Sequence, residues 1–256
     1  MNYGICNLSI VALRASANHT SEMISQVLFG ETFEILETDK SWSYIKLSFD
    51  NFEGYINNKQ FIEISESKFL KLQSSKSVFS SDILGMITKG NNEFFTIPFG
   101  STLPFFENKQ LKLGNNTYTY DSDIITSKCL KEEILHTAYS YLNSPYLWGG
   151  RTHFGIDCSG FTQMVYKLCG YKIPRDAKDQ SSCGEVLSFI EESEAGDLAF
   201  FDNEDGEIIH VGIILNDYHI IHAHGKVRID TLDHSGIFNA DLQKHTHKLR
   251  VIKKLI

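Results

Sequence analysis

The pattern of apolar residues changes near position 129, and this change limits what the chain can fold into. Before it, runs such as TFEILETDK and SWSYIKLSF carry β-branched and aromatic residues and are interrupted by Gly, Asn and Asp. Such runs are typical of strands in a small barrel. After it, apolar residues at 130, 134, 138 and 141 have helical spacing, and strand-like runs follow from GDLAFFD onward. The sequence therefore predicts an α+β domain preceded by all-β structure.

A chain of 256 residues is long enough for more than one domain. We place a first all-β domain at residues 1–65, a second and weaker one at 66–128, and the α+β domain at 129–256. Within the first, SEMISQVLFGE at 21–31 has a composition that also allows a helix ended by Gly30, or a long loop between barrel strands.

Bulk properties exclude some classes of protein. A formal net charge of −8 argues against nucleic-acid binding, which requires a basic face. No apolar run approaches the roughly 18 residues of a membrane helix. The first residues, MNYGICNLSIVALRAS, lack the basic and apolar regions of a signal peptide. We therefore expect a cytoplasmic monomer, or a periplasmic or secreted one if a leader has been removed.

Cys158 differs from the other cysteines, at 6, 129, 169 and 183, because it follows a Gly-rich loop and an aspartate. We predict a helix that begins at Cys158 with Asp157 as its N-cap. A thiol there lies at the positive end of the helix dipole, which favours the thiolate, and the free N–H groups could stabilise an oxyanion. The other cysteines are predicted to be small buried residues.

A nucleophilic cysteine needs a base and a group that orients the base. His210 begins the strand-like run HVGIILN and is the candidate base. In YHIIHAH, strand alternation places His222 and His224 on one face and His219 on the other, so spacing leaves two candidates for the third residue. A zinc site formed by His210, His222, His224 and a Cys or Asp is the chemical alternative. The chain lacks His-Glu-x-x-His and Cys-x-x-Cys, so we predict no metal and no cofactor.

Five motifs occur in order over roughly residues 140–225: WGGRTHFGIDCSGF, IPRDAKDQ, AGDLAFF, HVGI and IIHA. This set resembles the NlpC-type family of papain-like cysteine peptidases, which cleave bacterial cell-wall peptides. The resemblance implies a papain-like core with Cys158 as nucleophile, His210 as base and His222 as the orienting residue.

The first 65 residues resemble the bacterial SH3-like domain of γ-D-glutamyl-L-diamino acid endopeptidases, through SEMISQVLFGE and the later EGYI. The domain order of those enzymes implies a second SH3-like domain at 66–128. Their activity implies hydrolysis of the γ-D-Glu–diamino acid bond in small murein peptides with a free N-terminal L-Ala, which would recycle cell-wall peptides.

The same resemblance assigns the substrate contacts. Arg175 would bind the substrate carboxylate and Asp176 its free amine, although without the resemblance this pair would be taken as a loop salt bridge. Some relatives have Ser where this chain has Ala177, so one carboxylate hydrogen bond would either be missing or come from Ser159 or water. The predicted substrate-binding residues are Asp157, Ser159, Arg175, Asp176, Glu22 and Tyr55.

Three alternatives remain at this stage. The protein could be a secreted hydrolase that acts on intact cell wall and uses its SH3-like domains to hold the polymer. It could be a non-catalytic module that binds peptides. The papain-like core also supports acyl transfer or amide hydrolysis on substrates outside the wall.

Overall fold

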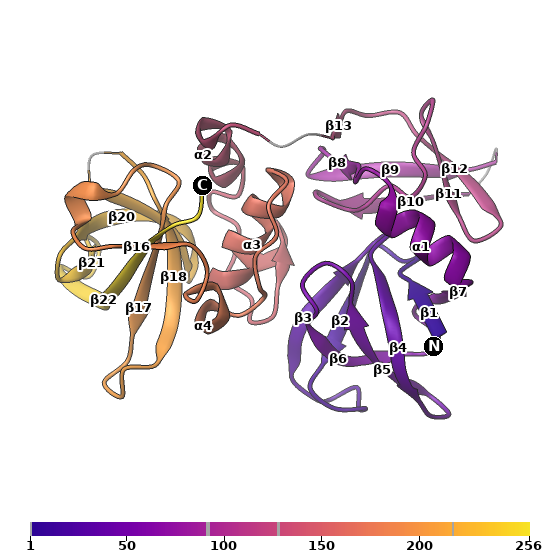
Figure 1. The fold of residues 1–256 in the computed structure, drawn as a ribbon, viewed down its shortest axis with the longest axis horizontal. Coiled ribbons are helices and arrows are strands. Elements are labelled where there is room, and N and C mark those ends of the chain that lie inside the picture. The colour runs from indigo at the N-terminus through magenta and orange to yellow at the C-terminus, as the bar shows by residue number, and fades with distance from the viewer. Residues whose placement is uncertain (1, 91–92, 127–128, 217) are drawn as a thin grey trace. The chain divides into compact units, whose positions relative to one another are not determined.

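A computed structural model describes residues 2–90, 93–126, 129–216 and 218–256. The chain forms two compact units, Met1–Ser127 and Lys128–Ile256 (Figure 1). The first unit is mostly β-structure, and the second combines helices with a sheet, so the predicted α+β division is confirmed. No helix within the described ranges is long and apolar enough to cross a membrane.

Seven strands of the first unit form an antiparallel sheet in the order β3-β2-β6-β5-β4-β1-β7. They are β1 (Asn2–Ile5), β2 (Ile10–Arg14), β3 (Met23–Leu28), β4 (Thr32–Thr38), β5 (Trp42–Leu47), β6 (Glu53–Asn57) and β7 (Ile62–Ile64). Alternate residues such as Val11 and Leu13 on β2 enter a buried core with Phe33, Ile45 and Ile56.

Residues 21–31 are neither the helix nor the loop that their composition allowed. Met23–Leu28 forms β3, which pairs with β2 through Val11–Val27 and its neighbours. The last four residues of β3 are buried. Pairing with an existing strand and burial of these side chains outweigh the local helical preference.

The remainder of the first unit contains a second, four-stranded sheet in the order β10-β9-β12-β11 and a two-stranded pair, β13-β8. Its elements are α1 (Glu66–Ser74), β8 (Phe79–Ser80), β9 (Leu84–Lys89), β10 (Glu93–Pro98), β11 (Gln110–Leu113), β12 (Asn116–Tyr120) and β13 (Ile124–Ile125). Ile5 on β1 and Phe29, just after β3, lie in the core of the second sheet with Ile87 and Tyr120. The two all-β parts therefore share apolar packing.

The second unit holds three α-helices and a seven-stranded sheet in the order β16-β22-β17-β18-β19-β20-β21, and β22 also pairs with β21, so the sheet closes on itself. The helices and short elements are α2 (Lys131–Ser140), β14 (Arg151–Thr152), β15 (Gly155–Ile156), α3 (Cys158–Leu168), α4 (Ala177–Gln180) and the 3-10 turn η1 (Ile190–Glu192). The sheet strands are β16 (Glu185–Leu187), β17 (Leu198–Asp202), β18 (Ile208–Ile214), β19 (His219–His224), β20 (Lys226–Asp233), β21 (Gly236–Asn239) and β22 (Lys244–Lys254).

Helix α3 lies at one side of the closed sheet, where it packs against β18 and β19 and against α2 (Figure 1). Every residue of α3 is buried, including the polar ones. The predicted start at Cys158 and the predicted N-cap Asp157 are confirmed. Gly170 follows the helix with a positive φ of 81°, a conformation that glycine adopts without strain. This packing brings the first turn of α3 close to the sheet.

Candidate active site

Cys158 is the first residue of α3 and is 6% exposed. The side chain of Asp157 accepts a hydrogen bond from the Gly160 N–H at 2.6 Å, which fixes the first turn. A Cβ atom on Gly160 would lie 2.3 Å from the carbonyl oxygen of Gly150. Only glycine therefore allows the Gly-rich loop to pack directly against the turn that carries the thiol.

Arg175 is buried and forms a bidentate ion pair with Asp157. Its Nη1 and Nη2 atoms donate to Asp157 Oδ1 and Oδ2 at 3.0 and 2.5 Å, and Nη1 also donates to Ser159 Oγ at 2.9 Å. Asp157 Oδ2 accepts a further bond from the Gly149 N–H at 2.8 Å. Arg175 thus holds the N-cap of α3. Its predicted contact with a substrate carboxylate stays a prediction.

We expect Arg175→Met to destabilise the second unit by about 3–5 kcal/mol, because it leaves the buried Asp157 carboxylate without its counter-charge. Urea denaturation in a Trp42→Phe background, with Trp148 as the reporter, measures this change. Arg250→Met is the matched control: Arg250 is 61% exposed and lies 3.7 Å from Asp202, so its loss should cost less than about 1 kcal/mol. Equal costs for the two variants would contradict the role given to Arg175.

The sheet brings two histidines together. Gly212 on β18 pairs with His222 on β19, so His210 is the diagonal neighbour of His222 on the same face. The ring atoms His210 Nε2 and His222 Nδ1 lie 2.8 Å apart. A Cβ on Gly212 would lie 2.9 Å from the Cβ of His222, so glycine allows this close approach. His224 is exposed at the end of β19, and it is His222 that contacts His210.

Asp230 on β20 extends this pair, and sequence reasoning missed it. His222 pairs with Arg228 across the sheet, so Asp230 is the next residue on the same face. The atoms His222 Nε2 and Asp230 Oδ2 lie 3.0 Å apart, and Arg228 Nη2 donates to Asp230 Oδ1 at 2.8 Å. Although burial raises the pKa of Asp230, the hydrogen bonds from His222 and Arg228 lower it below its ordinary value. Asp230 is therefore a carboxylate.

The carboxylate fixes the tautomers of both rings. An ionised carboxylate only accepts hydrogen bonds, so His222 carries its proton on Nε2 and its Nδ1 is an acceptor. His210 must then donate from Nε2, which leaves the lone pair on its Nδ1 free. Burial is the largest cause that lowers the pKa of His210 well below 6.5, followed by His222 and further histidines nearby. The His210 ring is thus a neutral base.

Burial of Cys158 opposes the thiolate that its place on the helix favours. Burial raises the pKa of Cys158 to about 12, and the charge of Asp157 adds to this effect. Hydrogen bonds from the backbone N–H groups of Val211 and Ser159 act in the opposite direction, as does Arg175, but do not outweigh burial. The Val211 contact also places the sulfur beside the residue that follows His210. The resting pair is therefore a neutral thiol and a neutral imidazole.

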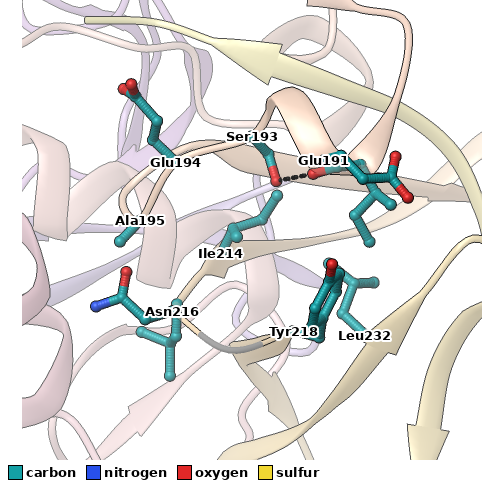
Figure 2. Close-up of a pocket in the computed structure, with 10 residues that line it drawn as sticks. Glu191, Ser193, Glu194, Ala195, Ile214, Asn216, Tyr218 and Leu232 are labelled. Carbon is teal, nitrogen blue, oxygen red and sulfur yellow. Dashed lines mark hydrogen bonds between the residues drawn. The ribbon is translucent and has the colours of Figure 1, made fainter.

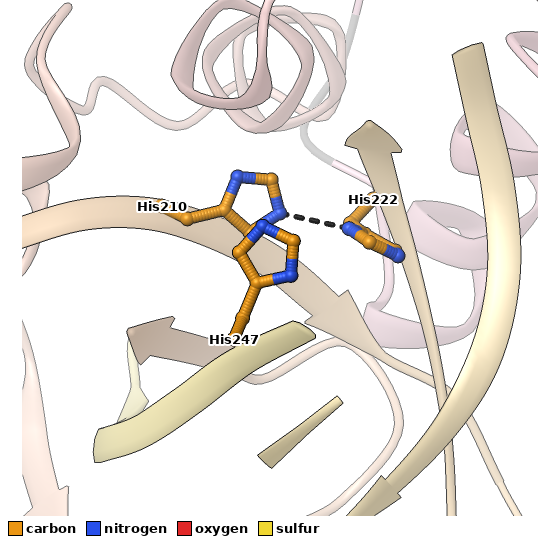
Figure 3. Close-up of side chains that lie close together, drawn as sticks. All are labelled: His210, His222 and His247. Atoms are coloured by element: carbon orange, nitrogen blue, oxygen red, sulfur yellow. Dashed lines mark hydrogen bonds between the residues drawn. The ribbon is translucent and has the colours of Figure 1, made fainter. Parts of the chain in front are cut away.

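Two further residues near this pair were missed from the sequence. The His247 ring on β22 stacks on that of His210, with centroids 4.2 Å apart and an interplanar angle of 23° (Figure 3). Tyr146 lies on the loop before Cys158, and burial raises its pKa to about 12, followed by the charges of Cys158 and Asp157. An aromatic side chain thus lies within electrostatic range of the thiol.

The remaining predicted substrate residues lie on other segments of the chain. Asp176 is exposed and begins α4 as its N-cap, next to the buried Ala177. Glu22 and Tyr55 belong to the first unit, where Glu22 is exposed and the Tyr55 ring packs on Tyr44 at 4.9 Å. Their contacts with substrate stay predictions.

A separate hollow lies at the other end of β18 (Figure 2). It has a volume of about 360 Å³ and contains none of the predicted site residues. Its lining includes Glu191, Ser193, Glu194, Ala195, Ile214, Asn216, Tyr218 and Leu232. Ile214 and His210 are four residues apart on β18, about 13 Å at the usual rise of a strand. The hollow is therefore distinct from the histidine cluster.

Each of the two units contains a region that matches a known protein family. Residues 143–249 match the sequence profile of the NlpC/P60 family, and residues 13–61 match that of the bacterial dipeptidyl-peptidase SH3 domain. The γ-D-glutamyl-L-lysine dipeptidyl-peptidase of Bacillus subtilis (strain 168) is 30% identical over 214 residues, which cover 78% of this chain and 71% of that protein. Dipeptidyl-peptidase 6 of Lysinibacillus sphaericus is 26% identical over 246 residues, or 86% and 88% of the two chains.

Among solved structures, an NlpC/P60 family protein from Bacillus cereus ATCC 10987 has the same fold, with a TM-score of 0.84 at 18% identity over 99% of both chains. Fold and family profiles together define a cysteine peptidase whose α+β papain-like core follows SH3-like barrel structure, as the sequence predicted. The chain belongs to the NlpC/P60 family.

Proposed function

We propose that this protein hydrolyses the γ-D-Glu–diamino acid bond of murein peptides with a free N-terminal L-Ala, and that Cys158, His210 and His222 carry the reaction. The chemistry rests on two observations: the hydrogen-bonded series from His210 through His222 to Asp230, and the bond to the Cys158 sulfur from the backbone N–H of Val211, the residue after His210. The substrate class is supported by the relatives named γ-D-glutamyl-L-lysine dipeptidyl-peptidase in Bacillus subtilis and Bacillus cereus.

The proposed reaction starts from the neutral pair. As the Cys158 sulfur attacks the amide carbonyl, its proton passes to Nδ1 of His210, and the N–H groups of the first turn of α3 receive the oxyanion. His222, held by Asp230, stabilises the imidazolium that forms. The imidazolium then gives its proton to the leaving amine of the diamino acid. Water hydrolyses the thioester, with His210 again acting as the base.

The free amine of the substrate is the proposed basis of selectivity. Asp176 is an exposed carboxylate at the start of α4, the element that directly follows the buried Arg175. A carboxylate that binds an ammonium group out of water makes a charged hydrogen bond. We therefore assign the amine contact to Asp176, with Glu22 and Tyr55 as further proposed contacts. An enzyme that requires a free amine acts on small peptides, so we propose a role in recycling.

We expect acetylation of the substrate's N-terminal Ala to lower kcat/KM at least about a hundredfold, on the order of 3 kcal/mol. Acetylation removes the positive charge and adds bulk at the same position, so a charged hydrogen bond is lost. The measurement is mass spectrometry of products from wall tri- and tetrapeptides, each supplied with a free and an acetylated amine. The same panel reports which diamino acid is preferred.

Asp176→Asn tests the assigned contact within that panel. It should reduce the preference for the free amine, mainly by slowing cleavage of the unacetylated peptide. Lys178→Gln, an exposed charge change two residues away, should leave the preference intact. Equal cleavage of free and acetylated peptides by the unmodified enzyme would overturn the recycling proposal. Activity on intact wall would then favour a wall hydrolase.

A further inference from the structure

We propose that His210, His222 and His247 form a binding site for a divalent transition-metal ion such as Zn²⁺, and that an ion bound there inhibits the peptidase. One ring nitrogen from each histidine lies within 4.8 Å of the other two. The three side chains come from β18, β19 and β22, strands of one closed sheet, and their rings converge in Figure 3. The inhibitory part rests on the proposed function, whereas the binding part does not.

The spacing suits an imidazole-bound metal. Zinc binds histidine nitrogens at 2.0–2.1 Å in tetrahedral geometry, so two ligand nitrogens are about 3.4 Å apart. The observed separations bracket this value, from 2.8 Å between His210 Nε2 and His222 Nδ1 up to the 4.8 Å limit of the cluster. To hold the ion, the rings would have to shift by roughly an ångström and turn so that their lone pairs converge, since the His247 ring is stacked on that of His210. Three histidines with a water are an established zinc ligand set.

The rings of His222 and His247 each have a polar partner on one nitrogen, as histidines that bind metals usually do. His222 Nε2 faces Asp230 Oδ2 at 3.0 Å, which leaves Nδ1 for the metal. Thr246 Oγ1 lies 2.9 Å from His247 Nδ1, which leaves Nε2. A carboxylate or hydroxyl on the distal nitrogen orients a ligating imidazole and raises its basicity.

A bound ion would remove the base from the reaction. The metal takes the lone pair of His210 at Nε2, so the proton that this nitrogen donated to His222 moves to Nδ1. The ring stays neutral, and no net proton is released from it. Nδ1, the atom that would accept the thiol proton, then carries a hydrogen. Cys158 is left without an acceptor for its proton.

Zn²⁺ inhibition of peptide hydrolysis tests the effect on activity. With thiols kept reduced by a phosphine, Zn²⁺ should inhibit the full-length enzyme, and a chelator should restore the rate. His247→Phe keeps an aromatic ring against His210 but has no ligand atom, so its inhibition constant should rise at least about tenfold. Each variant is compared with its own rate without metal.

His245→Phe is the matched control. His245 lies on the same strand, is exposed and faces Asp233 at 2.9 Å, outside the cluster. Its inhibition constant should stay within about twofold of the unmodified enzyme, since the ligand set is intact. Equal inhibition of His247→Phe and the unmodified enzyme would overturn the proposed site, as would the absence of inhibition.

Binding can be measured without turnover. Titration calorimetry in a Cys158→Ala background should show one Zn²⁺ site, which the additional change His247→Phe weakens or removes. If Zn²⁺ binds in this pattern but the unmodified enzyme does not cleave the peptides, the proposed function fails and the metal site stands. If the enzyme cleaves the peptides but this site is absent, the metal inference fails alone.

Discussion

Cys158→Ala should abolish hydrolysis of the free-amine murein peptides while the protein stays folded. The sulfur is the only atom removed, and the proposed thioester cannot form without it. The cap of α3 does not depend on this side chain, because Asp157 receives its bonds from the Gly160 and Gly149 N–H groups and from Arg175. Product analysis by mass spectrometry and the thermal unfolding midpoint measure the two expectations.

Cys183→Ala serves as the control for this change. Cys183 is a half-buried thiol just after α4, and it should be replaceable with no loss of rate. Iodoacetamide should inactivate the enzyme in proportion to the labelling of Cys158. A near-normal rate for Cys158→Ala, or labelling of Cys183 first with loss of activity, would contradict the assignment of the nucleophile.

The features predicted correctly from the sequence are those that depend on a few neighbouring residues. The N-cap of α3 is an example, since Asp157 and Gly160 are three residues apart and their hydrogen bond requires nothing beyond the turn itself. The motifs around Cys158, His210 and His222 are likewise short and carry the family resemblance. Features that depend only on neighbouring residues can be predicted from a single sequence.

Features that depend on strand register were missed. Alternation places Arg228 and Asp230 on one face of a strand, but the sequence does not say which neighbouring strand that face meets. His247 reaches His210 only because β22 closes the sheet against β17 and β21. The sequence of residues 21–31 likewise allows a helix or a loop but does not indicate a strand, because the pairing of this stretch with β2 is a long-range contact.

The ionisation of the Cys158 thiol depends on its burial, and burial is set by the whole fold. The helix terminus favours a thiolate at Cys158, and this effect is visible in the sequence. The packing of α3 against β18 desolvates the thiol, and this raises its pKa. Arg175 shows the same dependence on the whole fold: its pairing with Asp157, 18 residues earlier, could not be read from the sequence.

His210→Ala should lower kcat/KM by about ten-thousandfold, because the neutral thiol, with its pKa raised to about 12, then has no base. His222→Ala should cost less, about ten- to a hundredfold, since it only orients the base. Rates are measured on the free-amine tripeptide for both variants. His219→Ala, an exposed change on the same strand as His222, should stay near the unmodified rate.

Asp230→Asn separates orientation of the base from simple packing. The amide is nearly isosteric, but its nitrogen can donate to His222 Nε2, which reverses both hydrogen bonds and leaves His210 Nδ1 protonated. We expect about a tenfold or greater loss in kcat with KM little changed. Nitrogen NMR of the two rings should show the tautomers exchanged. If the tautomers are exchanged but the rate is unchanged, His222 and Asp230 take no part in the mechanism. If His224→Ala loses more activity than His222→Ala, the residue that orients His210 is His224 and not His222.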